Sequence, residues 1–294
     1  MRIKLLTDSS SDVPLDLVRE SNGILEFIGM PITINGEEFI DDLGEEFSHE
    51  FFYEELTKGV MPKTSQINTI SFYDKFIDHY QSGYATICIG LSSGLSGTYN
   101  NAILARTMVL EEAPEANIIV FDSFAASVGL GVLVLYVLDL IKDGMELSDI
   151  SLLIDEQKLH ANHWFAVDSL MHLKNGGRIP AAIAYVGTVL NIKPILTIKD
   201  DGKLESFSSV RGKKKAFKYL AAKVAENIGD SRVIILLGHA NIKEDADTLV
   251  DELRSLGVEN RIIETCLSAT IASHVGPGML AVAFMGNKDR ISKK

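Results

Sequence analysis

The sequence is poor in the residue types that mark disulfide-rich and nucleic-acid-binding proteins. It has only two cysteines, Cys88 and Cys266, and both lie in apolar runs, which favours a protein that is kept reduced. Lysine and arginine number 28 against 40 aspartates and glutamates, so the formal net charge is -12. A molecule of that charge repels polyanions, and we therefore expect no nucleic acid partner.

Long hydrophobic runs are also scarce. The first residues, MRIKLLTDSS, contain no apolar stretch of the kind found in secretory signals, and we expect a cytoplasmic protein. Residues 124–141 are almost wholly apolar, but the run is barely long enough to span a membrane, contains Asp139 and has no basic flank before it. The run therefore favours a helix that is buried on all sides.

The first half of the chain alternates apolar runs typical of strands with amphipathic runs typical of helices. Strands are predicted at 3–6, 24–34, 84–89 and 117–121, and helices at 49–59, 71–80, 100–110 and 125–140. This alternation predicts an α/β domain with a mostly parallel sheet and helices on both faces. Ligands of such sheets bind beyond the carboxyl ends of the strands.

After a helix predicted at 147–160 the pattern changes. Residues 194–207 predict a β-hairpin, because the Asp-Gly pair at 201–202 suits a tight primed turn. Helices at 213–227 and 244–256 and strands at 233–237 and 261–265 follow. We therefore predict a second, α+β domain, with the division at 1–157 and 158–294.

A loop rich in glycine and hydroxyl groups, GLSSGLSGTY at 90–99, follows the strand predicted at 84–89. Its G-x-S-x-G pattern is that of a nucleophile elbow, which would make the protein a serine hydrolase acting on acyl esters with Ser92 as nucleophile. His239, His274 and Asp122 are then candidates for the rest of a triad. The loop has no lysine and matches no P-loop, so we expect no ATP site there.

The same loop can instead hold an anion without attacking it. Its hydroxyl groups and the free N–H groups at the start of the next helix suit a carboxylate or a phosphate. A second hydroxyl-rich loop, MPKTSQ at 61–66, suggests that two loops bind one small anion. For Ser92 alone, helix capping is the favoured explanation.

Two stretches in the second half add basic residues. In NGGRIP at 175–180, two glycines let the backbone and the guanidinium of Arg178 approach a partner closely, although a solvated turn explains the same residues. In SHVGPG at 273–278, His274 precedes a rigid turn. A lone histidine of this kind is often structural.

Taken in order, these stretches resemble the DegV family of bacterial fatty acid-binding proteins, called FakB where they serve a fatty acid kinase. The resemblance extends from residue 3 to about residue 286. It is carried by TDSSSD at 7–12, PKTSQ at 62–66, LSSGLSGTY at 91–99, NGGR at 175–178, KPIL at 193–196 and HVGPG at 274–278.

The resemblance implies a non-enzymatic carrier. Family members bind a long-chain fatty acid in an apolar tunnel of the first domain and present its head group to a separate kinase, which makes the acyl phosphate used in phospholipid synthesis. No cofactor is implied beyond the bound fatty acid. Helices at 49–56 and 125–140 are candidates to line the tunnel.

The resemblance also assigns site residues. Thr64 and Ser96 match the hydroxyl groups that hold the carboxylate, and Ser65 and Ser93 are their neighbours. Arg178 and His274 match basic residues near the carboxylate and the docking surface.

Three further features are assigned simpler roles. His160 and His163 are three residues apart, but no other cluster of ligands accompanies them, so we predict no metal site. Asp8 and Asp12 are expected to organise the first strand-to-helix turn. The basic run 211–218 favours a solvated helix face, with a patch for a protein partner or a transient membrane contact as the alternative.

Overall fold

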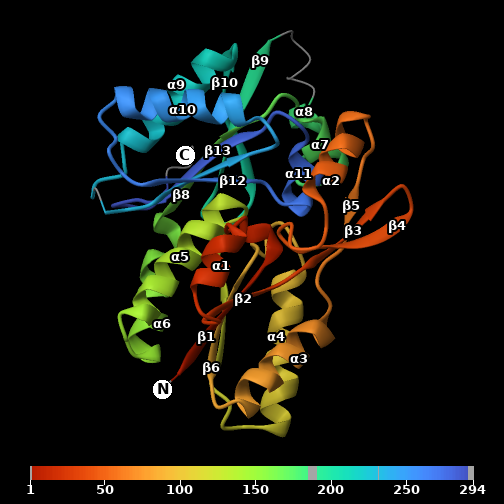
Figure 1. Cartoon of the computed structure of the whole chain (residues 1–294), viewed down its shortest axis with the longest axis vertical. Helices are drawn as coiled ribbons and strands as arrows, with labels where there is room; N and C mark the ends of the chain where they lie inside the picture. The colour runs from red at the N-terminus through yellow and green to blue at the C-terminus, as the bar shows by residue number, and fades with distance from the viewer. Residues whose placement is uncertain (1, 185–190, 231, 291–294) are drawn as a thin grey trace.

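The computed structural model describes residues 2–184, 191–230 and 232–290, and its elements are labelled in Figure 1. A four-stranded sheet of order β2-β1-β6-β7 forms one end of the molecule, and all of its strands are parallel. Its strands are β1 (Ile3–Asp8), β2 (Leu25–Ile28), β6 (Ala85–Gly90) and β7 (Ile118–Asp122). The alternating pattern of the first half of the sequence therefore predicted the sheet type correctly.

Helices cover both faces of this sheet. α3 (Thr69–Gln81) and α4 (Thr98–Glu112) pack against β6, and α5 (Val128–Lys142) packs against β1 from the other side (Figure 1). Two shorter helices, α1 (Leu15–Glu20) and α6 (Leu147–Gln157), also belong to this half.

The predicted strand 24–34 is two strands that belong to different sheets. The chain leaves the parallel sheet at Gly29, where a Cβ would lie 2.9 Å from the carbonyl oxygen of Asp41. A small antiparallel sheet of order β4-β3-β5 follows, built from β3 (Met30–Ile34), β4 (Glu37–Asp41) and β5 (Lys63–Thr64). Its last strand places Thr64 opposite Ile32. Helix α2 (His49–Thr57) is capped by Ser48, whose side chain accepts a hydrogen bond from the N–H of Phe51.

The second half forms a six-stranded mixed sheet of order β10-β9-β8-β13-β11-β12. Its strands are β8 (Ala161–Ala166), β9 (Ile192–Ile198), β10 (Leu204–Arg211), β11 (Ile235–His239), β12 (Ile262–Cys266) and β13 (Leu280–Met285). The sequence analysis predicted neither β8 nor β13, although these two strands form the centre of the sheet. The remaining helices of this half are α7 (Met171–Asn175), α8 (Ala181–Ala184), α9 (Lys213–Ala225), α10 (Lys243–Ser255) and α11 (Ala269–Val275).

The hairpin β9–β10 forms where it was predicted, but its turn is not of the primed type. Among residues 199–203 only Gly202 has a positive φ, at +74°, and its N–H donates to the carbonyl oxygen of Lys199 over 2.9 Å. A primed I′ turn needs two central residues with positive φ, whereas a longer loop needs one left-handed glycine. The Asp-Gly pair therefore marks the end of a longer turn.

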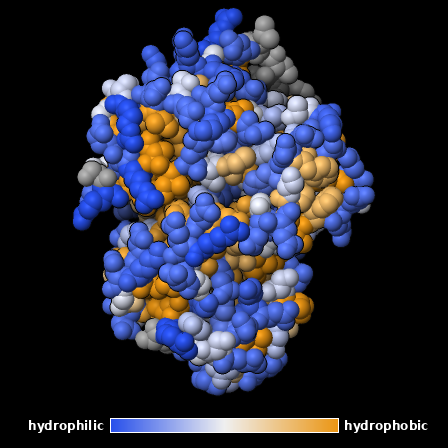
Figure 2. Space-filling model, viewed as in Figure 1, coloured by the Kyte–Doolittle hydropathy of each residue, from blue (hydrophilic) through white to orange (hydrophobic). Residues whose placement is uncertain are grey.

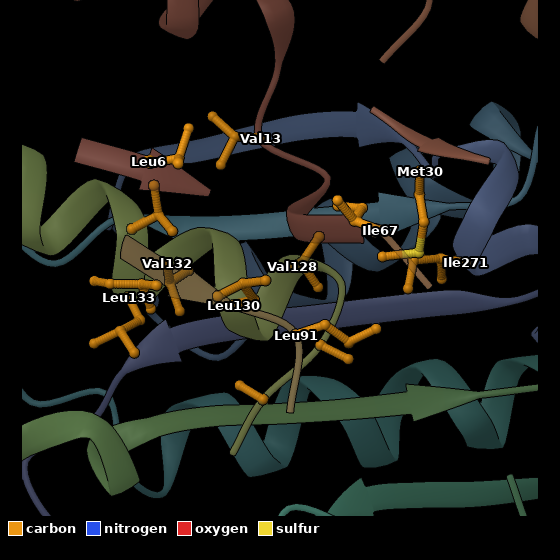
Figure 3. Packing of buried hydrophobic residues seen from close by; sticks show 14 of the residues in the cluster. Leu6, Val13, Met30, Ile67, Leu91, Val128, Leu130, Val132, Leu133 and Ile271 are labelled. Carbon is orange, nitrogen blue, oxygen red and sulfur yellow. The ribbon is translucent and has the colours of Figure 1, made fainter. Parts of the chain in front are cut away.

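Helix α5 joins the two large sheets, since it packs on β1 and also on β8, β11 and β13. Ten of its fifteen residues are buried, which agrees with the prediction of a helix buried on all sides. Figure 3 shows Val128, Leu130, Val132 and Leu133 of this helix in the same apolar cluster as Leu6 and Val13 from the first sheet and the turn after it. No helix in the described ranges is long and apolar enough to cross a membrane.

The face of the molecule in Figure 2 is mostly hydrophilic, with separate hydrophobic patches. The predicted domain boundary at 157–158 falls between α6 and β8. Because α5 packs against both sheets, the division into two domains stays a prediction. The basic run 211–218 extends into the first turns of α9, where its lysines are exposed. There, Nζ of Lys213 lies 2.5 Å from a carboxylate oxygen of Asp245.

Candidate functional site

A narrow pocket lies between the two halves of the chain. Its cavity volume is about 80 Å³, within about 730 Å³ of unfilled space that includes the mouth. Most of its lining is apolar and comes from both halves, as in Met30, Leu91, Phe165, Ile271 and Met279. Figure 3 shows the side chains of Met30 and Ile271 close to each other, with Leu91 on the neighbouring loop.

Polar side chains gather in one part of the lining: Thr64, Ser65, Gln66, Ser96, Arg178 and His274. A chain of contacts links them. The Nε of Arg178 donates to the carbonyl oxygen of Leu95 over 3.2 Å, directly before Ser96. Gly176, two residues before Arg178, has no side chain because a Cβ there would lie 2.3 Å from Nδ1 of His274.

Thr64 and His274 form the direct link across this group. The hydroxyl of Thr64 and Nε2 of His274 are 2.8 Å apart. β5 positions the threonine at the edge of the small sheet, and α11 positions the histidine in its last turn. Both residues were assigned from the family resemblance, and the fold brings them together from 210 positions apart.

His274 is neutral at pH 7. Burial, together with the nearby Arg178, lowers the pKa of His274 to about 4. A neutral imidazole has one donor and one acceptor nitrogen. Nδ1 is buried without a partner in the described part of the chain, so Nε2 can either donate to Thr64 or accept from it.

Ser96 stands at the entry to α4. Its hydroxyl is 2.9 Å from that of Thr98 and accepts a hydrogen bond from the N–H of Thr98 over 3.3 Å. The fifteen-residue helix that begins here directs its positive end toward this part of the pocket. An anion at this place meets hydroxyl groups, a helix N-terminus and a guanidinium.

Arg178 is half-buried, and burial lowers its pKa from the usual value. Its guanidinium also donates to the carbonyl oxygen of Gly176. These two backbone contacts hold the cationic side chain beside Ser96 and His274. Among residues 2–184, 191–230 and 232–290, no carboxylate forms an ion pair with it.

Two serines of the glycine-rich loop lie elsewhere. Ser93 is exposed and outside the pocket lining, and its N–H donates to the carboxylate of Asp122 over 3.1 Å. Ser92 is fully buried, and its hydroxyl donates to the carbonyl oxygen of Gly202 over 2.8 Å and accepts from the N–H of Gly94. Ser92 therefore anchors the hairpin β9–β10 to the loop.

The candidate hydrolase residues do not form a triad. His239 pairs with Glu264 at 3.0 Å, and His274 pairs with Thr64. Asp122 accepts N–H groups from Ser93 and Phe124. Within residues 2–184, 191–230 and 232–290, neither histidine is bonded to Ser92, so the geometry gives no support to the nucleophile reading.

The two N-terminal aspartates do more than organise one turn. Asp8 accepts hydrogen bonds from the N–H groups of Ser10 and Leu91, at 3.0 and 2.8 Å. Asp12 accepts from the hydroxyl of Ser127 and from the N–H of Ser268, which lies 256 positions away. Burial raises the pKa of Asp12 to about 7. These carboxyl groups tie the first turn to the loops around the pocket.

The sequence analysis missed part of the lining. His163 and Phe165 from β8 line the pocket, as does Met279 just before β13. The aromatic pair Trp164-Phe165 was the available signal, but the preceding helix was extended to residue 160, directly before the strand. No residue of α2 is among the described lining residues, and only Ala126 and Ser127, just before α5, come from the other expected helix.

A family model described as "Uncharacterised protein, DegV family" matches residues 2–287. The chain belongs to the DegV family. A DegV domain-containing protein of Clostridium perfringens is 36% identical over 284 residues, which cover 96% of this chain and 97% of that protein. One from Lactococcus lactis is 34% identical and covers 99% of this chain and 100% of its own length.

Solved DegV structures have the same fold. A DegV family protein from Thermus thermophilus, described for its fatty acid binding, superposes with a TM-score of 0.86 at 30% identity, covering 97% of this chain and 100% of that one. DegV from Bacillus subtilis, described as a fatty acid binding protein, has a TM-score of 0.84 at 29% identity, with coverage of 98% and 100%. The two-part mixed α/β architecture is thus that of the family.

Proposed function

We propose that this DegV-family protein binds one long-chain fatty acid in the pocket between its two halves and presents the head group to a kinase for acyl phosphate formation. The observation that carries the proposal is the Thr64–His274 hydrogen bond of 2.8 Å at the polar part of an otherwise apolar pocket. The fatty acid binding described for similar DegV proteins from Thermus thermophilus and Bacillus subtilis supports it.

The hydrocarbon tail supplies most of the affinity, since each buried methylene contributes about 0.8 kcal/mol. A ligand of this size usually occupies a pocket of roughly 300–1,000 Å³. The cavity of about 80 Å³ is much narrower, so binding requires the apolar side chains to move apart. Met30 and Met279 suit this movement because methionine side chains are unbranched and adaptable.

The carboxylate is held by neutral donors. When Nε2 of His274 donates to Thr64, the hydroxyl proton of Thr64 is free for one carboxylate oxygen, and Ser96 can donate to the other. Neutral donors satisfy an anion without the desolvation of a second buried charge. The head group therefore remains available for phosphoryl transfer.

The first test removes the two hydroxyl groups. Thr64→Val combined with Ser96→Ala should weaken fatty acid binding about tenfold or more, because a hydrogen bond to a charged group contributes roughly 1.5–3 kcal/mol. Binding is measured by titrating delipidated protein with a fatty acid, and folding by circular dichroism. Ser93→Ala is the matched control, since Ser93 belongs to the same loop and lies outside the pocket lining. Equal affinities for the double variant and the control would refute the site.

The second test separates binding from presentation. Arg178→Ala should lower the rate of acyl phosphate formation in a reconstituted system with a fatty acid kinase more than it lowers lipid affinity, because the tail dominates binding. Mass spectrometry of small molecules extracted from the purified protein identifies the natural ligand. An equal loss of rate and affinity would assign Arg178 to lipid binding alone.

A further inference from the structure

The hairpin of strands β3 and β4 projects from the side of the molecule, with β4 outermost (Figure 1). Within the described ranges β4 pairs with β3 alone, so it forms a free edge of the sheet β4-β3-β5. A free edge presents unpaired backbone groups to which another strand can be added. Proline, lysine and bulges commonly protect such edges, but β4 contains none of them and pairs with β3 in an unbroken register.

The turn of the hairpin determines which backbone groups face outward. Asn35 and Gly36 have φ angles of +52° and +90°, as in a type I′ turn, and the register pairs Ile34 with Glu37. The pair that flanks such a two-residue turn is hydrogen-bonded, and along an antiparallel ladder every second pair is not. Glu38 is therefore the first residue of β4 whose N–H and C=O point away from β3.

The opposite side of β3 agrees with this assignment. The carbonyl oxygen of Pro31 accepts a hydrogen bond from the N–H of Ser65 over 2.9 Å, so the backbone of Pro31 faces away from β4. Pro31 pairs with Ile40, whose N–H and C=O therefore also point outward. In the described part of the chain no group is hydrogen-bonded to the backbone of Glu38 or Ile40. The edge thus offers two N–H groups and two carbonyl oxygens to a further strand.

The side chains of β4 form a charged pair followed by an apolar pair. Glu37 and Glu38 are exposed, and neither forms an ion pair within residues 2–184, 191–230 and 232–290. Phe39 comes next, and then Ile40, which is 53% exposed. Because side chains alternate between the two faces, each face of β4 carries one carboxylate and one apolar group. A strand laid along this edge meets two carboxylates at one end and two apolar side chains at the other.

An aromatic cluster beside the edge has the same character. The ring centroid of Phe39 lies 5.3 Å from that of Phe47 and 6.0 Å from that of Phe51, which is 39% exposed. Glu46 and Glu50, the residues before Phe47 and Phe51, are both exposed. Apolar rings bordered by carboxylates attract a segment that is both basic and apolar. They repel an anionic membrane, and a second copy would bring carboxylates of the same sign together.

We propose that β4 is a docking site at which a partner protein adds an extended segment as a further strand of this sheet. The segment has two consecutive apolar residues beside two consecutive basic residues. The apolar pair lies opposite Phe39 and Ile40, and the basic pair lies opposite Glu37 and Glu38. The same sheet carries Thr64 into the pocket, so the partner docks on the element that holds a head-group residue. This inference goes beyond the proposed function, because it needs no fatty acid.

The test uses a capped, labelled peptide of about ten residues, the length of a long strand, with threonines around a central valine-valine-lysine-lysine sequence. The reverse order of the central residues is also made, so that both antiparallel and parallel pairing are covered. The full-length wild type should bind one of the two peptides in a fluorescence anisotropy titration. Glutamates in place of the lysines should weaken binding roughly fivefold or more. In NMR measurements, amide hydrogen exchange at Glu38 and Ile40 should slow when the peptide is bound.

Two variants of the protein address the edge itself. Ile40→Pro removes an outward N–H without removing a ladder bond, which an edge strand tolerates, and should weaken peptide binding roughly threefold to tenfold. Ile40→Val keeps the N–H and should bind as the wild type does. Glu38→Lys should weaken binding about twofold to fivefold, as expected for an exposed ion pair. Glu111→Lys, an equal charge change at an exposed position of α4, is its control and should have no effect.

The proposal is overturned if the wild type binds neither peptide, or if Ile40→Pro and Glu38→Lys both bind as the wild type does. It is also overturned if sedimentation shows a dimer of the wild type that Ile40→Pro dissociates, because the edge then belongs to a second copy. Should Ile40→Pro not fold, Glu38→Lys and the hydrogen exchange of the wild type decide. None of these measurements needs a fatty acid, so failure of the proposed function would leave this inference standing.

Discussion

Three serines of one loop have three different roles, although the local sequence around them is nearly repetitive. Ser92 is buried and bonded to Gly202, Ser93 is exposed, and Ser96 lines the pocket. Their roles depend on which residues the fold places opposite each hydroxyl. Ser92, the serine of the G-x-S-x-G motif, therefore has a structural role in this protein.

Replacing Ser92 by alanine should lower the stability without preventing fatty acid binding. The buried carbonyl oxygen of Gly202 and the partly buried N–H of Gly94 both lose their partner, which costs about 1–3 kcal/mol in free energy of unfolding. Urea denaturation measures the loss, with Ser93→Ala as the exposed control that should be neutral. Stoichiometric labelling of Ser92 by a fluorophosphonate probe would contradict this role and revive the hydrolase.

At the scale of elements, α5 is the helix on which the architecture depends. Its small residues let it approach its neighbours closely: a Cβ on Gly131 would lie 2.6 Å from the backbone carbonyl oxygen of Ser11. Backbone atoms of that turn cannot move aside easily, since Ser9, Ser10 and Ser11 are all buried. Glycine in the middle of a helix is therefore required here by packing.

Gly131→Ala should destabilise the protein by about 1–3 kcal/mol through overpacking, even though alanine favours the helix by about 1 kcal/mol over glycine. Thermal or urea unfolding measures the change. Thr107→Ala, on the exposed part of α4, is the control: it removes only an exposed hydrogen bond to the carbonyl oxygen of Ile103 in the same helix, so the better helix propensity of alanine should raise stability slightly. A raised melting temperature for Gly131→Ala would show that the contact with Ser11 is loose.

At the scale of the whole molecule, the pocket lies at a seam that long-range hydrogen bonds hold together. Asp12 accepts from the N–H of Ser268 at 2.8 Å, Tyr53 donates to the carbonyl oxygen of Leu267 at 2.9 Å, and Asp41 accepts from the N–H of Thr270 at 2.8 Å. All three reach the segment at the start of α11, which carries His274. A ligand in the pocket therefore contacts both halves and should stabilise them jointly.

Adding fatty acid to delipidated protein should raise the free energy of unfolding by about 2.7 kcal/mol when the free ligand is at one hundred times its Kd. For a chain of 294 residues the melting temperature should then rise by roughly 4 °C. Differential scanning calorimetry measures the shift. The Thr64→Val, Ser96→Ala variant should show a smaller shift at the same ligand concentration, and an identical shift would place the lipid elsewhere.

The first sheet and the hydroxyl-bearing loops could be predicted from the sequence, whereas the middle of the second sheet could not. β1, β6 and β7 are short apolar runs followed by helices, and local periodicity is enough to identify them. β8 is buried at every position although it contains Asn162 and His163, so it shows neither an unbroken apolar run nor a period-2 pattern. It also begins directly after a helical segment. The type of the turn at Gly202 was also predicted wrongly. An Asp-Gly dipeptide does not by itself specify the length of the loop that contains it.

By itself the sequence determined the alternation of strands and helices, the family and the loops that supply hydroxyl groups, because these are encoded in neighbouring residues. Only the tertiary structure decided that Thr64 meets His274, that Ser93 lies outside the pocket and that His163 lines it. Those facts depend on the register between strands and on packing between segments up to 210 positions apart. The periodicity of apolar side chains indicates which face of a helix or strand is buried. Which other element packs against that face depends on the tertiary structure of the whole chain.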